Sequence, residues 1–290
     1  MRVLVATDGS DGARTAAQWL ADFPLPADTN VLVASAVDLP PSPLEIPTVT
    51  AFKAALLADA QAGIDPLLPL FKNRVASVES RVLEGDPRQV LVQLAHDWRA
   101  DLIVTGARGL GAVATAVLGS VSLGIARHAP CAVLVVHPNP RPLRAVAVAL
   151  DGSAASDHAA RFLAALPLPA TVSVRLVGVV EPPPMPRTAP RTARAWLHDA
   201  VKSVTDDRRR VLDEALARAA KRFPAHAGHE LPVGAPTETL ERLSSEVDLV
   251  VLGARGLGAM KRVLLGSVSE RVLRHAGCSV LIVHAPSGGS

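Results

Sequence analysis

The sequence predicts an α/β protein made of two tandem, doubly wound sandwiches, each with a five-stranded parallel sheet. Three observations lead to this prediction. The second half of the 290-residue chain repeats the first, and a proline-rich segment, HPNPRPLR at residues 137–144, separates the two copies. Within each copy, short Val, Leu and Ile runs alternate with Ala- and Leu-rich helical stretches. Runs that are apolar on both faces and separated by helices indicate parallel sheets covered on both sides.

The repeat is visible in three pairs of segments. They are VLVATDGS (3–10) and VAVALDGS (146–153), DLIVTGARGLG (101–111) and DLVVLGARGLG (248–258), and HAPCAVLVVH (128–137) and HAGCSVLIVH (275–284). From Gly106 onward, corresponding residues lie 147 positions apart, as Gly106 and Gly253 do. Such a long period indicates duplication of a whole domain, because solenoid repeats recur every 20 to 50 residues or so. We expect domains at residues 1–137 and 144–285, each large enough to bury its own core.

The strands are expected in the same order in both copies. They are 2–7, 30–37, 75–83, 101–105 and 131–136 in the first, and 145–150, 171–180, 229–233, 248–252 and 278–283 in the second. Proline-rich segments, DLPPSPLEIP and EPPPMPRTAP, follow the second strand of each copy and lead into helices that begin near Ala51 and Ala193. These segments lie at the carboxyl side of the sheet, where open α/β folds bind ligands, so they are candidate lids or partner surfaces.

Composition excludes several classes of function. Apolar residues make up 49% of the chain, but no apolar run reaches the roughly 18 to 20 residues of a membrane helix, and the first residues lack a signal-peptide layout. We expect a soluble, cytoplasmic protein that does not bind a membrane. A net charge of +3 is too small to indicate nucleic-acid binding, and acidic residues interleave with Arg208, Arg209 and Arg210, which is typical of a solvated helix face. Cys131 and Cys278 open equivalent strands and are expected to be small core residues.

A glycine segment with the spacing G-x2-G-x9-G-S follows the fourth strand of each copy. Glycines after a strand let the backbone turn and approach a ligand closely. The Gly-Ser pair begins a helix, where free N–H groups and the helix dipole stabilise an anion. Together with the DGS after the first strand, the segment predicts a phosphate cradle. The alternative is structural: the glycines make tight turns and Ser120 and Ser267 cap helices.

These motifs resemble the universal stress protein family in its tandem two-domain form. The VxxDGS opening, the G-x2-G-x9-G-S segment and the H-A-x-C-x-V-L-x-V ending carry the resemblance, which covers nearly the whole chain. It implies two nucleotide-binding domains of the subclass that holds ATP or a related adenine nucleotide. It also suggests that the last strands of the two copies pair, so that the chain forms an intramolecular pseudo-dimer and leaves homodimerisation open.

The resemblance also assigns roles to individual residues. Asp8 and Asp151 would lie near the ribose or a phosphate-bound Mg²⁺ ion, Ala36 and Val179 against adenine, and Ala6 and Ala149 beside the base. The phosphates would be lined by Gly106, Gly109, Gly119, Ser120, Val121 and Ser122 in the first copy, and by Gly253, Gly256, Gly266, Ser267, Val268 and Ser269 in the second.

Four charged residues have alternative roles. Because a carboxylate near phosphates is favourable only beside sugar hydroxyls or a hard cation, Asp8 and Asp151 are candidate metal ligands. Their alternative is an N-cap of the following helix, and the two roles can coexist. Arg108 and Arg255 lie between the first two glycines and either reach a terminal phosphate or are solvated loop residues.

The two copies differ just after the cradle, where Leu123-Gly124 replaces Glu270-Arg271. A glycine within a helix costs about 1 kcal/mol relative to Ala, so the first of these helices is expected to be weakened or repurposed, with its cradle intact.

Three functions are consistent with these residues. The favoured one is a non-enzymatic stress-response regulator, in which ATP occupancy changes a protein-partner surface. The second is a slow ATPase or autophosphorylating protein with Ser120 or Ser267 as acceptor. The sequence has no P-loop lysine, which argues against this function. The third is an interaction module whose sites stay empty.

Overall fold

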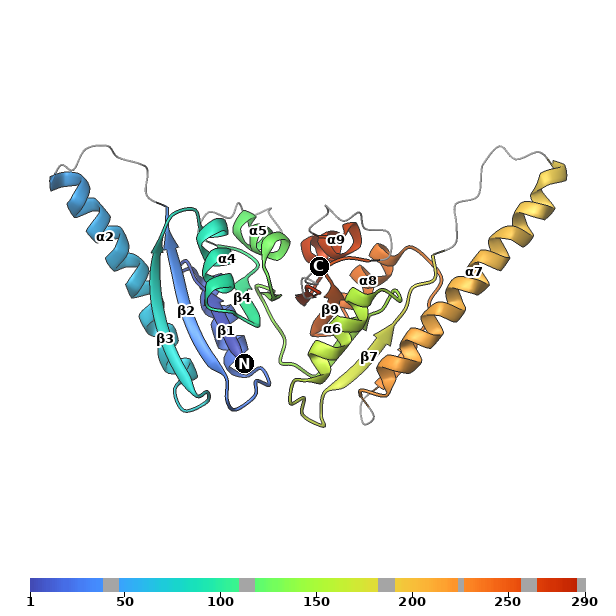
Figure 1. The fold of residues 1–290 in the computed structure, drawn as a ribbon, viewed down its shortest axis with the longest axis horizontal. Coiled ribbons are helices and arrows are strands. Elements are labelled where there is room, and N and C mark those ends of the chain that lie inside the picture. The colour runs from blue at the N-terminus through green and yellow to red at the C-terminus, as the bar shows by residue number, and fades with distance from the viewer. Residues whose placement is uncertain (39–46, 110–117, 182–190, 224–226, 257–264, 286–290) are drawn as a thin grey trace.

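The computed structural model describes residues 1–38, 47–109, 118–181, 191–223, 227–256 and 265–285 (Figure 1). Within these residues, ten strands form one sheet in the order β3-β2-β1-β4-β5-β10-β9-β6-β7-β8. The strands are β1 (Arg2–Ala6), β2 (Asn30–Val37), β3 (Ser77–Glu84), β4 (Leu102–Gly106), β5 (Ala132–Val136), β6 (Ala145–Ala149), β7 (Ser173–Val177), β8 (Ala227–Glu230), β9 (Leu249–Gly253) and β10 (Ser279–Val283). Each half contributes five parallel strands, which confirms the predicted fold class.

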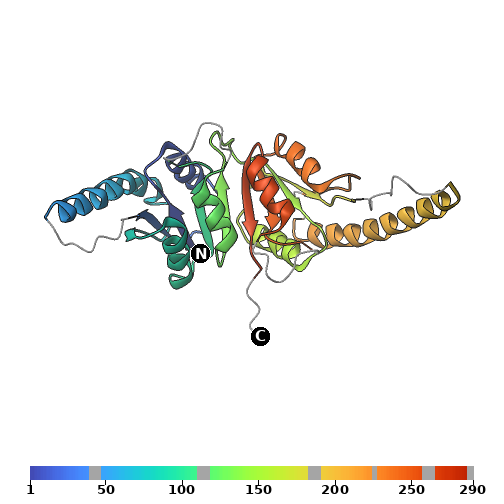
Figure 2. The same ribbon diagram turned by 90° about the horizontal axis from the view of Figure 1, so that it is seen from above.

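Helices cover both faces of the sheet. One face carries α1 (Asp11–Ala21), α2 (Pro47–Ile64), α3 (Leu68–Phe71), α6 (Ala154–Ala164) and α7 (Arg191–Ala220), and the other carries α4 (Pro87–Asp97), α5 (Ser120–His128), α8 (Pro236–Ser244) and α9 (Ser267–His275). Each face has its own apolar core, with Phe71 and Leu216 in the first and Ile125 and Val272 in the second. The long helices α2 and α7 extend outward at opposite ends of the molecule (Figure 2).

Two predicted strands of the second half differ from the structure. The strand expected at 171–180 is β7, Ser173–Val177, and the strand expected at 229–233 is β8, Ala227–Glu230. The two segments stay side by side beyond these bounds, because Val180 and Val233 form an isolated parallel bridge. Pro232 precedes Val233 and has no N–H to donate, so the regular ladder ends before it.

The proline-rich segments lie mostly outside the described residues, at 39–46 and 182–190, so the lid prediction stays untested. The helices after them begin at Pro47 and Arg191, slightly earlier than expected. Proline is favourable at the first position of a helix, where its missing N–H is not needed. The last proline of the first segment therefore starts α2 instead of delaying it.

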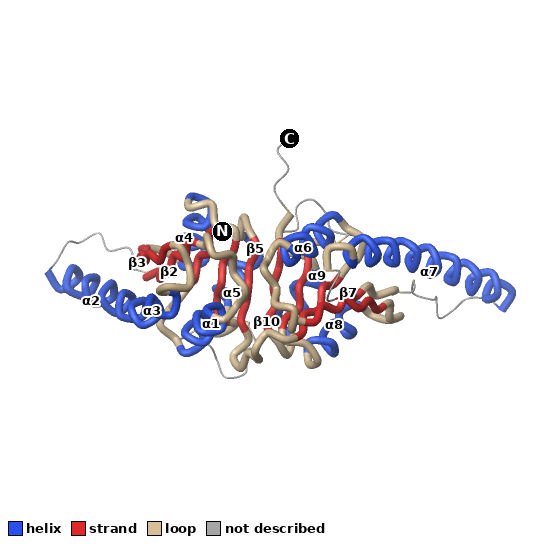
Figure 3. The backbone as a smooth tube through the Cα atoms, turned by 90° about the horizontal axis from the view of Figure 1, so that it is seen from below, coloured by secondary structure: helices blue, strands red, loops and turns tan. Residues whose placement is uncertain are grey.

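The last strands of the two halves, β5 and β10, pair antiparallel at the centre of the sheet (Figure 3). Leu134 is opposite Leu281, and every residue of both strands is buried. The backbone N–H of His137 also donates to Ser279 Oγ at 3.2 Å. The expected pairing of the last strands within one chain is therefore present.

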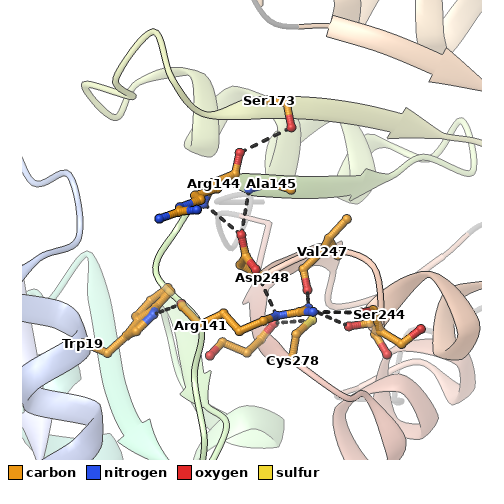
Figure 4. A network of polar contacts seen from close by, with 11 residues as sticks. Trp19, Arg141, Arg144, Ala145, Ser173, Ser244, Val247, Asp248 and Cys278 are labelled. Carbon is orange, nitrogen blue, oxygen red and sulfur yellow. Dashed lines mark hydrogen bonds and ion pairs between the residues drawn. The ribbon is translucent and has the colours of Figure 1, made fainter.

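The linker between the halves is held by a polar network (Figure 4). Trp19 of α1 donates its indole N–H to the carbonyl oxygen of Arg141 at 2.8 Å. The Arg141 guanidinium forms an ion pair with Asp248 at 3.0 Å and donates to the Ser245 carbonyl at 2.9 Å, near the C-terminus of α8. The same Asp248 carboxylate accepts two backbone N–H bonds, from Arg144 and from the next residue, at 2.8 Å each. One linker residue thus contacts both halves.

A second polar contact joins the halves through the helices that follow the glycine segments. Arg127 of α5 donates to the Glu270 carboxylate of α9 at 2.7 Å, and Arg274 donates to the same carboxylate at 3.0 Å. The hydrogen bond from Arg127 lowers the pKa of the Glu270 carboxyl. Nearby, His284 lies 3.0 Å from the Ala126 carbonyl oxygen through its Nε2. The α5 and α9 helices are therefore in direct contact with the opposite half.

Replacing Arg141 with Ala is expected to lower the free energy of unfolding by about 2 kcal/mol, because a charged hydrogen-bond donor is removed from a partly buried carboxylate and helix carbonyls. Urea denaturation of the full chain measures the change. The Arg144→Ala variant is the control, since Arg144 contributes its backbone N–H to Asp248 and keeps it. Equal stability of the two variants would contradict the role of the Arg141 side chain.

The Arg127–Glu270 pair predicts a pH-dependent stability. Because the pKa of Glu270 is lower in the folded chain than in the unfolded chain, the pair stabilises the fold above the unfolded pKa, and this stabilisation is lost as the pH falls through the folded pKa. Denaturation of the unaltered chain and of Glu270→Gln should show a stability gap at pH 7 that narrows on acidification. A gap that stays constant down to acid unfolding argues against the pair.

Candidate functional site

A cavity of about 990 Å³ opens at the carboxyl ends of β6, β7 and β9 in the second half. Because neighbouring parallel strands end at the same edge of a sheet, the loops after these strands meet there. All ten residues predicted for the second site line this cavity: Ala149, Asp151, Val179, Gly253, Arg255, Gly256, Gly266, Ser267, Val268 and Ser269.

The DGS turn after β6 fixes the position of Asp151. The Asp151 carboxylate accepts the backbone N–H of Ser153 at 3.0 Å, and Gly152 has a φ of +82°, a conformation that favours glycine. The N-cap of α6 is Ser153, whose hydroxyl oxygen accepts the N–H of Ser156 at 3.1 Å. The alternative role of Asp151 as the helix cap is therefore wrong.

The first half repeats this turn. Asp8 accepts the N–H of Ser10 at 3.0 Å, Gly9 has a φ of +78°, and Ser10 caps α1 by accepting the N–H of Ala13 at 3.2 Å. Asp8 is thus not the helix cap either. In both halves the capping is done by the serine, and the aspartate shapes the turn two residues earlier.

The first glycine of each segment is required by packing. A Cβ at Gly253 would lie 2.7 Å from the backbone carbonyl carbon of Ala155, and a Cβ at Gly106 would lie 2.6 Å from the carbonyl oxygen of Gly12. These glycines let the end of β9 or β4 approach the first turn of α6 or α1. The fold itself therefore needs these glycines, whether or not a ligand approaches them.

The second glycine of each segment meets the DGS aspartate. A Cβ at Gly256 would lie 2.5 Å from Asp151 Oδ2, and a Cβ at Gly109 would lie 2.3 Å from Asp8 Oδ2. Each aspartate and the glycine that it meets are more than 100 residues apart in the sequence, yet they form one surface. A methyl group at either glycine would displace the carboxylate from its position.

The third glycine of each segment begins a helix. Gly119 and Gly266 are the N-caps of α5 and α9, and neither makes a side-chain capping bond. Ser120 and Ser267 are the first helical residues, so the alternative in which their side chains cap the helices is wrong. The backbone N–H groups of the first helical turn have no carbonyl partner one turn earlier and can bind an anion.

The two serines that follow differ in what they can offer a ligand. Ser267 has an exposed side chain on the cavity wall. The Ser269 hydroxyl is buried and donates to the Gly253 carbonyl oxygen at 2.8 Å, as the Ser122 hydroxyl does to Gly106 at 2.7 Å. The hydroxyl hydrogens of Ser122 and Ser269 are therefore engaged within the fold, and their backbone N–H groups are the donors left for a phosphate.

The first half places its predicted residues in the same way. Ala6 and Gly106 are the last residues of β1 and β4, and Ala36 is near the end of β2, so all three lie at the carboxyl edge beside Asp8. The other six, in the glycine segment and at the start of α5, are Arg108, Gly109, Gly119, Ser120, Val121 and Ser122. Residues 110–117 and 257–264 of the two segments lie outside the described residues.

The two loop arginines have different surroundings. Arg255 is exposed and lines the cavity of the second half. Arg108 is partly buried, and its Nε makes no hydrogen bond within the described part of the chain. Its guanidinium is close enough to His137 to contribute to lowering the pKa of that imidazole, which burial lowers most.

Gly124, the departure of the first half from the repeat, has a packing role. A Cβ at Gly124 would lie 2.9 Å from Cγ of Arg88, so the glycine makes room for this side chain of α4. In the second half the arginine comes from the other helix of the pair: Arg271 of α9 forms an ion pair with Glu241 of α8 at 2.9 Å. This contact supports the expectation that the helix after the first cradle is repurposed.

One wall of the cavity was missed by the sequence analysis. The α7 residues Val204, Asp207, Arg208, Val211 and Leu212 line it, at the spacing of one helical face. Arg208 is exposed, as expected of a solvated helix face, and it also lines the cavity. The sequence feature that could have revealed this wall is that Val204 and Val211 lie on the same helical face as Asp207 and Arg208.

The described residues contain no group of three or more His, Cys, Asp or Glu side chains that could hold a metal ion. A cation at Asp8 or Asp151 would therefore take further ligands from other oxygens, such as those of phosphate or water, and the metal assignment stays a prediction. Cys278 is buried and Cys131 partly buried, and burial raises the pKa of both thiols to about 12, as expected of small residues packed in the core. No helix among the described residues is long and apolar enough to span a membrane.

Comparisons with known proteins agree with this geometry. The sequence model of the universal stress protein family matches residues 1–137 and 142–284. A universal stress protein of Mycobacterium bovis is 29% identical over 98% of this chain and 95% of its own, and one of Mycobacterium tuberculosis is 31% identical over 71% of this chain and 68% of its own.

Among solved structures, a universal stress protein from Archaeoglobus fulgidus has the same fold, with a TM-score of 0.66 and 17% identity over 99% of this chain and 97% of that one. Its identity is low, so it supports the fold alone. The two family matches, however, cover nearly the whole sequence in two tandem copies. The chain therefore belongs to the universal stress protein family.

Proposed function

We propose that each half binds ATP or a related adenine nucleotide, and that occupancy regulates a protein partner during a stress response. The phosphates would lie at the N-terminus of α5 or α9 and the ribose near Asp8 or Asp151. Mg²⁺, if bound, would be held by the aspartate and the phosphate oxygens. We also propose a cytoplasmic location. Light scattering would measure whether the chain forms a homodimer.

One observation carries the proposal: the cavity of the second half is lined by all ten predicted residues. Its lining combines two kinds of chemistry. Glycines and the N-terminus of α9 suit phosphates, and apolar side chains such as Val179, Val204 and Val211 suit an apolar ring. A volume of about 990 Å³ is at the upper end of the usual range for small-molecule sites.

The described lining residues include the carboxylates Asp151, Glu181 and Asp207 and the arginines Arg208 and Arg255, but no lysine or histidine among those described. Enzymes of phosphoryl transfer position the phosphates with lysine or arginine and metal ions, and hold a base or an orienting residue near the attacking oxygen. A regulator that responds to occupancy needs only the cradle and a surface that changes.

Replacing Gly109 and Gly256 together with Ala is expected to weaken ATP binding about tenfold, or ~1.4 kcal/mol, because each methyl group displaces an aspartate carboxylate. Isothermal titration with ATP and Mg²⁺ should give two sites in the unaltered chain. The Gly228→Ala variant is the control, since a Cβ there meets nothing within 4 Å. The proposal would be contradicted if the unaltered chain bound ATP with a Kd of millimolar or weaker, or if the double variant bound ATP as tightly as the unaltered chain.

A second candidate function rests on Ser267, whose exposed side chain lines the cavity. Transfer of the terminal phosphoryl group of ATP to Ser267 Oγ would release ADP and leave a phosphoserine. This function predicts that intact-mass measurement after incubation with ATP shows one added phosphate, which is lost in Ser267→Ala but kept in Ser203→Ala, an exposed serine of α7 outside the cavity lining. An unchanged mass after hours excludes self-phosphorylation.

A further inference from the structure

The lining of the cavity in the second half comes from the carboxyl ends of β9, β6 and β7. Its cradle end is formed by β9 and the start of α9, and its other end by the segment after β7 together with α7. The strand order β9-β6-β7 places these ends two strand spacings apart, roughly 10 Å. A nucleotide with phosphates at the cradle and ribose near Asp151 would therefore have its base beside α7.

The face of α7 toward the cavity is apolar and uncovered at two positions. Val204 and Val211 line the cavity, yet they are 41% and 49% exposed. Leu212 on the same face is buried and anchors the helix to the sheet. Exposed valines on the wall of a ligand-sized cavity are what a flat apolar ring would cover.

Arg208 lies between these valines in the sequence and is tethered at the β7 end. Its Nη1 donates to the carbonyl oxygen of Glu181, directly after the Val180–Val233 bridge. A guanidinium is planar, always charged and able to stack on an aromatic face while its edge donates hydrogen bonds. The hydrogen bond to Glu181 therefore holds the Arg208 guanidinium, which suits a nucleobase, about two strand spacings from the phosphate cradle.

The first half differs at the corresponding position. The buried Ile64 and Leu212 correspond, and a Cβ at Gly63 would lie 3.0 Å from Cα of Gly9, whereas in the second half the side chain of Val211 fills this place beside Gly152. This alignment places Ala60 where α7 has Arg208. The α2 wall of the first half has neither the guanidinium nor the valine that lies beside the turn in the second half.

We infer that α7 is a base-recognising wall of the second site, in which Arg208 lies against the nucleobase and makes this site bind adenine nucleotides more tightly than the first. The inference rests on the proposed function and adds a specificity-determining residue to it. Arg208 here recognises the base, and the phosphates are left to the cradle.

The test uses the full chain with the first site disabled by Gly109→Val, and measures the Kd of ATP and the competition of tripolyphosphate against it. Arg208→Gln removes the planar cation and leaves a polar, uncharged side chain. It is expected to weaken ATP about tenfold and to leave tripolyphosphate unchanged. Arg209→Gln, an exposed neighbour outside the cavity lining, should change neither. In a Gly256→Val chain, where the first site remains, Arg208→Gln should leave ATP binding unaltered.

Each other result overturns the inference. Equal weakening of ATP and tripolyphosphate would assign Arg208 to the phosphates, and unchanged ATP binding would reduce it to a tether. An effect of Arg209→Gln as large as that of Arg208→Gln would indicate general attraction by positive charge. If the chain without substitutions binds no ATP, the proposed function fails together with the inference, whereas binding that is insensitive to Arg208 leaves the function standing.

Discussion

The antiparallel pairing of β5 with β10 is the interaction on which the rest of the architecture depends. It converts two five-stranded sheets into one and covers the edge that each half would otherwise expose, an edge that is prone to pair with other chains. It also brings α5 and α9 together, since each follows directly on the cradle and precedes one of the paired strands. The Arg127–Glu270 ion pair and the contact of His284 with the Ala126 carbonyl are consequences of this placement.

The pairing also explains why the linker is not a passive connection. Once β5 and β10 are side by side, the eight residues between the last strand of one half and the first strand of the other, 137–144, must run along the junction. Trp19 fixes the Arg141 carbonyl, and the Arg141 side chain fixes α8 and Asp248. The Asp248 carboxylate then holds the backbone at the start of β6, which carries the DGS turn at its other end.

Much of the fold and of the cradle could be predicted from the sequence because their signals are local and repeated. The apolar runs located strands such as β2, Asn30–Val37, and the strand–glycine order placed Asp151 and Gly256 at one edge. Contacts set by packing could not be predicted. The need for glycine at 253 arises from the backbone of α6, the cap at Ser153 from the geometry of the turn, and the cavity face of α7 from where that helix lies over the sheet.

The position of each element relative to the junction explains where the two halves differ most. The strands at the junction, β5 and β10, are equal in length and fully buried, because a change in one must fit the other. The α2 and α7 helices lie at the outer ends, where no such restriction applies. Pro66 has no N–H and disfavours helix in the residue before it, so α2 ends at Ile64 and a 3₁₀ turn follows, whereas α7 continues unbroken for 30 residues. The outer wall of each site can therefore differ while the cradle at its inner side stays the same, and this wall is where a difference in ligand binding between the halves is expected to arise.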